Sequence, residues 1–198
     1  MKLNEALFSR SYTPVVTTVL CADYALSGEW SEAQRYAKQA VALERYEMVP
    51  YAGIPRWFVT ETLLHTGNTA LAEEYIGKLG QYHEEGRRDR IEYLQASASL
   101  AQWEGQLGQA LSHLEEARAL AEEIGLPGEL WHIQTALAGL YQSRGEQVLA
   151  GQFCSQAAAV VHELTAMIED EALRTGFLAA PRVRHILDGS IPIAMTND

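Results

Sequence analysis

Four glycines, each followed at fixed distances by small or apolar residues, limit what this chain can fold into more than any other feature. Each is followed by alanine five positions later and by apolar residues nine and twelve positions later. The glycines follow one another at 39, 38 and 40 residues. Composition alone would give about half a match in the whole chain, so four matches in register indicate an internal repeat. The four sets are Gly28, Ala33, Ala37 and Ala40; Gly67, Ala72, Ile76 and Leu79; Gly105, Ala110, Leu114 and Ala117; and Gly145, Ala150, Cys154 and Ala157.

Each repeat has the features of two helices joined by a tight turn. Apolar residues precede each glycine at helical spacing, and glycine can end such a helix because it adopts a left-handed conformation without steric cost. Ser31 is a suitable N-cap for the helix that follows Gly28. The repeated small residues fall on one face of that second helix, so the two helix axes can approach closely. We therefore predict burial of the first alanine in each set: Ala33, Ala72, Ala110 and Ala150.

The pattern predicts helices throughout and no strand. Pro14, Pro55 and Pro127 fall near the starts of first helices, where the missing N–H does no harm, and no proline falls inside a predicted helix. The sequence thus predicts an all-α fold, a right-handed α-solenoid of about four helix pairs with a C-terminal capping segment. First helices are predicted over 13–27, 55–66, 89–104 and 128–144, and second helices over 31–46, 69–83, 107–124 and 147–168.

Domain boundaries follow from the same pattern. Residues 11–168 form the repeat domain, and residues 1–10 are either the tail of a preceding second helix or a frayed end. Residues 169–188 are predicted to form capping helices, with Pro181 opening the last one, and residues 189–198 to be disordered. The four repeats span 12–46, 54–83, 89–124 and 128–168.

Charge and composition exclude several classes of function. The net charge of −11 argues against a nucleic-acid-binding surface. No long apolar run is present that could span a membrane, and the first ten residues lack the apolar stretch of a signal peptide. Cys21 and Cys154 are far apart in the sequence, so no disulfide framework is expected. These features predict a cytoplasmic protein that binds neither nucleic acid nor a membrane.

No group of side chains points to catalysis or to a metal. The six histidines include no pair at i, i+4 spacing, and no Cys-x2-Cys occurs. His113 and Glu116 come nearest to a metal pair, and a solvated helix face explains them. Cys21 and Cys154 fall at packing positions, where cysteine acts as a small hydrophobic residue rather than as a nucleophile. We expect no enzyme activity, no cofactor and no metal.

Residues 21–43 resemble the tetratricopeptide repeat, a motif of two helices with small residues where the helices meet. Residues 101–120 and 136–160 resemble it too, and residues 62–79 do so more weakly, with Thr60 where a small apolar residue is usual. The period here is longer than the standard period of about 34 residues. The residues of the first repeat that match the motif are Cys21, Tyr24, Gly28, Ala33, Ala37 and Ala40.

A longer period of this kind is similar to that of the helical arrays in large bacterial regulators, such as the maltose-regulon activator group and cyclase-fused relatives. Residues 130–141 followed by 169–187 resemble the closing segment of those arrays. The resemblance implies a sensor or interaction region, and it identifies a scaffold better than an activity. The chain has no P-loop motif. The closing residues that match are Arg174, Phe177, Leu178, Pro181 and Val183.

The same resemblance places a binding surface on the first helices, which line the concave face of such arrays. Trp57 and Trp103 are either anchors for a ligand or packing residues between helices, whereas Trp30 and Trp131 are expected in the core. Thr18 and Ala22 are the counterparts in the first repeat. The candidates in the later repeats are Trp57, Glu61, His65, Gln95, Ser99, Gln102, Trp103, His132, Thr135 and Gln142.

The sequence therefore predicts a non-catalytic binding module, with a protein, a peptide or a small polar molecule as its ligand. The acidic balance favours a basic or neutral partner. The alternative is a self-associating scaffold, a homodimer without a small-molecule ligand, because open ends of helical arrays favour stacking.

Overall fold

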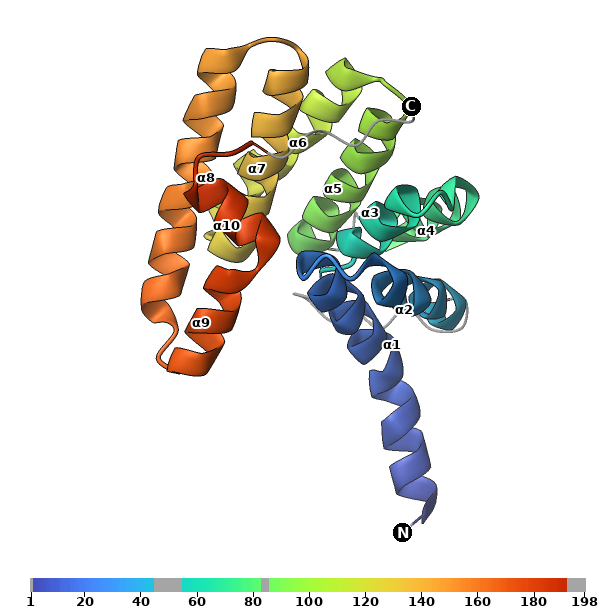
Figure 1. Cartoon of the computed structure of the whole chain (residues 1–198). Helices are drawn as coiled ribbons and strands as arrows, with labels where there is room; N and C mark the ends of the chain where they lie inside the picture. Colours follow the sequence, from blue (N-terminus) through green and yellow to red (C-terminus); the bar gives the residue numbers. More distant parts are fainter. Residues whose placement is uncertain (1, 45–54, 83–85, 192–198) are drawn as a thin grey trace. The chain divides into compact units, whose positions relative to one another are not determined.

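The computed structural model describes residues 2–44, 55–82 and 86–191. These residues form ten helices and no strand, so the prediction of an all-α chain is confirmed. The chain divides into two compact units, Met1–Ala96 and Ser97–Asp198. Figure 1 shows the helices coloured in chain order.

The first unit holds α1 (Lys2–Leu26), α2 (Trp30–Glu44), α3 (Trp57–His65), α4 (Thr69–Tyr82) and the first part of α5 (Arg87–Trp103). Here α1 packs against α2 and α3, and α3 packs against α2 and α4. The predicted repeat boundaries at residues 46, 54 and 83 lie outside the described residues.

The second unit holds the end of α5, then α6 (Leu107–Ile124), α7 (Pro127–Ser143), α8 (Gln147–Met167), α9 (Glu171–Ala179) and α10 (Pro181–Leu187). In this unit α7 packs against both α6 and α8, and α10 packs against α8 and α9. The helices from α2 to α8 begin and end within about two residues of the predicted bounds, the usual precision of such boundaries.

The four glycine turns make the same main-chain hydrogen bonds. Gly28, Gly67, Gly105 and Gly145 all have φ between +73° and +78°, the left-handed conformation that the repeat predicted. In each turn, the amide of the residue after the glycine donates to the carbonyl five residues earlier, as Gln106 does to Ala101 at 2.7 Å. The repeated alanine then donates to the carbonyl of that same turn residue, as Ala110 does to Gln106 at 3.0 Å. Each turn therefore closes one helix and starts the next.

The alanines that follow the four turns are buried, as predicted. Ala33, Ala72, Ala110 and Ala150 have almost no exposed surface. In the second repeat the next core position differs from the prediction: Tyr75 is buried, whereas Ile76 is only half-buried. On α4, the buried residue that follows Ala72 is therefore at i+3 rather than at i+4. Both positions lie on the same face of a helix.

Helix α1 is longer than predicted and contains Pro14, so the expectation that no proline lies inside a helix is wrong. Residues 2–10 belong to this same helix rather than to a separate preceding one. Proline removes one amide donor from a helix interior and crowds the preceding turn. Near it, the Thr17 hydroxyl donates to the carbonyls of Thr13 and Pro14 at 2.9 and 2.8 Å, and Thr18 donates to Pro14 at 2.9 Å.

The C-terminal helices lie against the last helix pair (Figure 1). On α9, the Phe177 ring meets Trp131 of α7 edge-on, with centroids 6.4 Å apart. On α10, Ile186 is buried in a cluster with Cys154 and Ala157 of α8. Ile191 packs against this cluster, so the start of the segment predicted to be disordered is ordered. The rest of that segment, residues 192–198, lies outside the described residues.

No helix among the described residues is long and apolar enough to cross a membrane.

Candidate functional site

In the first unit, most of the predicted binding residues are buried. Trp57, Glu61 and Gln95 have little exposed surface, and Thr18 and Ala22 on α1 are buried as well. Trp57 stacks on its neighbour Phe58, with ring centroids 3.9 Å apart. For Trp57, this burial favours the packing interpretation over the ligand anchor. A role of these side chains in binding stays a prediction.

In the second unit, most of the predicted residues keep exposed surface. Gln142 is exposed, and Ser99, Gln102, Trp103 and His132 are half-buried. Thr135 is buried, and its hydroxyl donates to the Trp131 carbonyl of its own helix at 2.7 Å. The Thr135 hydroxyl is therefore already used within α7.

Charged side chains are buried at the start of α3. The Glu92 carboxylate of α5 accepts a hydrogen bond from the Trp57 backbone amide at 3.1 Å. Beside it, Arg56 contacts Asp89 at 3.5 Å, and the Arg56 side chain is almost fully buried. Because the N-terminus of a helix carries partial positive charge, the Glu92 carboxylate stabilises it. The Arg56–Asp89 ion pair and the Trp57–Glu92 hydrogen bond therefore join α5 to α3 and serve the structure.

The buried Cys21 thiol is held between α1 and α3. Its Sγ lies 3.5 Å from the Thr62 hydroxyl and 3.9 Å from the Phe58 carbonyl. Burial, together with the nearby Glu61 carboxylate, raises the pKa of Cys21 to about 11. Burial also raises the pKa of Cys154 in the second unit. Both thiols therefore stay protonated near neutral pH, which makes them poor nucleophiles.

His65 lies against Trp30. The two rings are 3.8 Å apart between centroids, Trp30 is half-buried and His65 is exposed. Trp30 was expected to pack inside its own helix pair, and it instead lies on a residue of the next helix. No local pattern indicates this pairing, because the two residues are far apart along the chain.

His132 lies next to Trp131 on α7, within electrostatic reach of Arg182 on α10. Its ring lies 3.6 Å from Trp131, between centroids, and its Nδ1 atom is buried. Burial, assisted by the positive charge of Arg182 on α10, holds the pKa of His132 well below its usual range. At neutral pH, His132 is therefore uncharged, and one of its ring nitrogens can donate a hydrogen bond while the other can accept one.

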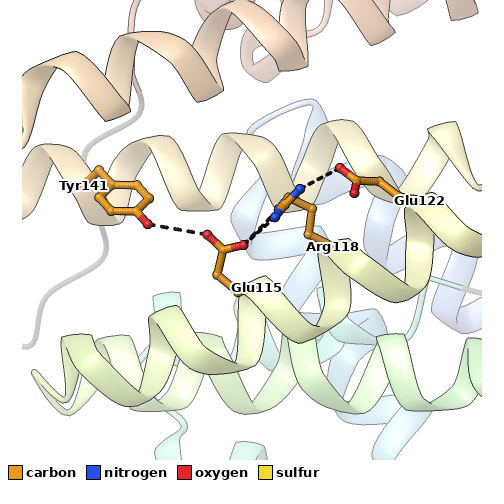
Figure 2. A network of polar contacts seen from close by, with 4 residues as sticks. All are labelled: Glu115, Arg118, Glu122 and Tyr141. Carbon is orange, nitrogen blue, oxygen red and sulfur yellow. Dashed lines mark hydrogen bonds and ion pairs between the residues drawn. The ribbon is translucent and has the colours of Figure 1, made fainter.

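A polar network on α6 and α7 was not among the predicted sites. Figure 2 shows Arg118 between Glu115 and Glu122. The ion-pair distances from Arg118 to these two carboxylates are both 2.8 Å. The Tyr141 hydroxyl donates to Glu115 at 3.4 Å. Burial and the Glu115 carboxylate raise the pKa of Tyr141. The charges lie at i, i+3 and i+7 of one helix, a spacing visible in the sequence.

The same network reaches α8. The Tyr141 ring stacks on Phe153, with centroids 5.4 Å apart and planes within 4° of parallel. The Arg118 guanidinium lies 6.0 Å from the centre of the Phe153 ring. These contacts tie α6, α7 and α8 together, and the two carboxylates of the network share the single positive charge of Arg118.

Within the described part of the chain, no three His, Cys, Asp or Glu side chains come together in a way that could hold a metal ion. The side-chain clusters described above are ion pairs, ring stacks and buried thiols. They can position helices and offer polar or aromatic contact, which suits recognition of another molecule.

Comparison of the chain with protein-family models, curated proteins and solved structures found no match.

Proposed function

We propose that this chain is a non-catalytic binding module that recognises a protein or a peptide through exposed faces of its helix pairs. The observation that carries the proposal is the glycine turn, which recurs four times with the same main-chain bonds and the same buried alanine. Arrays of equivalent helix pairs present extended surfaces, and such surfaces commonly serve as binding sites.

The second unit is the better candidate for the binding surface. Its predicted residues Gln102, Trp103, His132 and Gln142 keep exposed surface, whereas most of those in the first unit are buried. A half-buried tryptophan can serve as an apolar anchor, and glutamine side chains can supply polar contacts, which is a common combination in peptide-binding surfaces. The net charge of −11 favours a basic or neutral ligand over an acidic one.

The proposal extends to the kind of protein in which such a module works. The resemblance of residues 169–187 to the closing segment of bacterial regulator arrays supports a role as the sensor or interaction region of a transcriptional or signalling regulator. The genomic reading frame around the coding sequence tests this part. A nucleotide-binding or effector domain encoded with the chain would support the regulator role, and a gene encoding this chain alone would argue against it.

Peptide arrays test the binding function directly. The purified chain is applied to arrayed short peptides of basic, neutral and acidic composition, and binding is then measured by titration calorimetry. We expect binding to basic or neutral peptides, weakened by Trp103→Ala and by Gln142→Ala. Gln109→Ala, at an exposed position on α6, is the matched control and should bind as the native chain does. Equal binding by all variants would move the site elsewhere, and no binding to any peptide would reject a peptide ligand.

A further inference from the structure

Valine and tyrosine side chains are exposed or half-buried on one face of α1 and α2, and we propose that a second copy of this chain packs against this face. This inference goes beyond the proposed binding function and does not depend on it. This face, called the open face below, belongs to α1 and α2. It consists of Val16, Val19, Asp23, Tyr24, Arg35 and Tyr36.

Two valines of α1 are exposed where equivalent residues of later helices are buried. Val16 and Ile133 both lie twelve residues before a turn glycine, yet Val16 is 50% exposed and Ile133 is 0% exposed. Val19 and Phe58 both lie nine residues before one, and they are 39% and 1% exposed. The helices of Ile133 and Phe58 pack against an earlier helix of the chain, whereas α1 packs against α2 and α3, which both follow it.

An aromatic pair of the open face has a counterpart that contacts an earlier helix, and the residues of both pairs are half-buried. Tyr24 and Tyr36 lie four residues before and eight residues after Gly28, and their rings stack with centroids 5.5 Å apart and planes within 9°. Tyr141 and Phe153 stand in the same relation to Gly145 and stack in the same way.

The contacts of Tyr141 and Phe153 indicate what kind of partner the open face could bind. In the second unit, α6 contacts the pair through Glu115 on the Tyr141 hydroxyl and Arg118 near the Phe153 ring. On the open face, Arg35 of the same helix lies 4.2 Å from the centre of the Tyr36 ring. In the second unit, the stacked rings of Tyr141 and Phe153 contact another helix. The open face presents an equivalent stacked pair, Tyr24 and Tyr36.

The charges of the open face fit a second copy of the chain. Asp23 is exposed where its counterpart Leu140, also five residues before a turn glycine, is buried. This exposed carboxylate is available to pair with a basic side chain of a partner. Arg35 lies on α2 of the same face, with half of its side chain exposed beside its partner Glu32. In a two-fold contact the same patch meets itself, so the Asp23 of each copy can face the Arg35 of the other while the valines meet in the centre.

Sedimentation of the full chain at concentrations from about 1 µM to about 500 µM tests the proposal over the range of transient dimers. We expect a concentration-dependent dimer in the native chain. The double variant Val16→Asp, Val19→Asp should weaken it at least about tenfold, because apolar area is lost and like charges meet across the two-fold axis. The control Val148→Asp changes a valine of the second unit that is 75% exposed, and it should dimerise as the native chain does.

Disulfide cross-linking locates the contact. Cys21 and Cys154 are both buried, so the native chain should give no linked dimer under mild oxidation. At least one of Val16→Cys and Val19→Cys should form a disulfide-linked dimer, and Val148→Cys should not. The proposal is overturned if the native chain stays monomeric at every concentration or if the double aspartate variant dimerises unchanged. Equal linking by Val148→Cys, or linking by neither open-face cysteine, would overturn it too.

Discussion

The Glu92 side chain accepts a hydrogen bond from the Trp57 backbone amide at 3.1 Å, so a buried carboxylate of α5 caps the first turn of α3. The two residues are 35 positions apart, and the contact links two consecutive first helices. It is more buried than an ordinary N-cap, because Glu92 and Trp57 both have little exposed surface. Its loss should therefore be more costly than that of a surface cap.

Replacing this buried carboxylate should destabilise the chain. We expect Glu92→Ala to lower the free energy of unfolding by about 2–3 kcal/mol, because the buried Trp57 amide loses its charged hydrogen-bond acceptor. Urea denaturation followed by tryptophan fluorescence measures the change. Glu73→Ala, at an exposed position of α4, is the control and should alter stability by less than about 0.5 kcal/mol. Equal stability of the two variants would show that the cap contributes little.

The turn glycines should be sensitive to alanine for a conformational reason. At Gly105, with φ of +74°, an added Cβ would have no atom within 4 Å, so a steric clash with other residues is absent. Gly105→Ala should still cost about 1–2 kcal/mol, because alanine disfavours the left-handed conformation. Gly108, inside α6 and equally open, is the matched control. In thermal denaturation, Gly108→Ala should stabilise the chain by about 0.5–1 kcal/mol. A Gly105→Ala variant more stable than the native chain would contradict the left-handed conformation of Gly105.

The buried alanines should not accept larger side chains. Ala110→Leu should destabilise the chain by about 2–3 kcal/mol, because the added methyl groups have no space where α6 meets its neighbours. Ala119→Leu changes an exposed position of the same helix and should be nearly neutral. Differential scanning calorimetry compares the melting temperatures. If the two variants melted alike, the packing of this helix face would be wrongly assigned.

His132 should make stability depend on pH on the acid side. Its folded-state pKa lies below its unfolded value, so its contribution to stability is present above pH 6.5 and is lost as pH falls toward the folded pKa. His132→Gln should flatten this loss. Arg182→Gln should reduce it, because Arg182 helps to lower the pKa.

Denaturant midpoints measured between pH 7.5 and pH 5 test this dependence on His132. The control is His162→Gln, because His162 is an exposed residue of α8, and this variant should follow the native curve. A native chain and a His132→Gln variant with parallel curves would exclude His132 as the source.

Local signals were enough to predict most helices. The turn glycine and the alanine five residues later lie close together in the sequence, and both act within one turn of backbone, so the bounds of α6 were predicted without error. Pro14 misled the prediction for α1, because proline is normally a sign of a helix start, and here the helix continues through it. The order of Ile191 was missed for a different reason, since it depends on a contact with a cluster far away in the sequence.

The candidate site was harder to predict than the helices. Trp57 and Glu61 were selected by their place in a repeat motif, which gives a position along a helix but not the depth of burial. The stack of His65 on Trp30 and the bond from Tyr141 to Glu115 join different helices, and only the packing of those helices brings the side chains together. In each of these pairs one residue could be noted from the sequence, but the residue that it contacts could not be identified.

The glycine corners have a consequence for how such a chain can diversify. Because each corner is held by main-chain atoms and one left-handed glycine, its geometry makes few demands on the neighbouring residue types. Outward-facing positions such as Gln109 and Gln152 can therefore change without disturbing the joints between helices. The residues that build the corners and the residues that face solvent are different, so either set can vary while the other is kept.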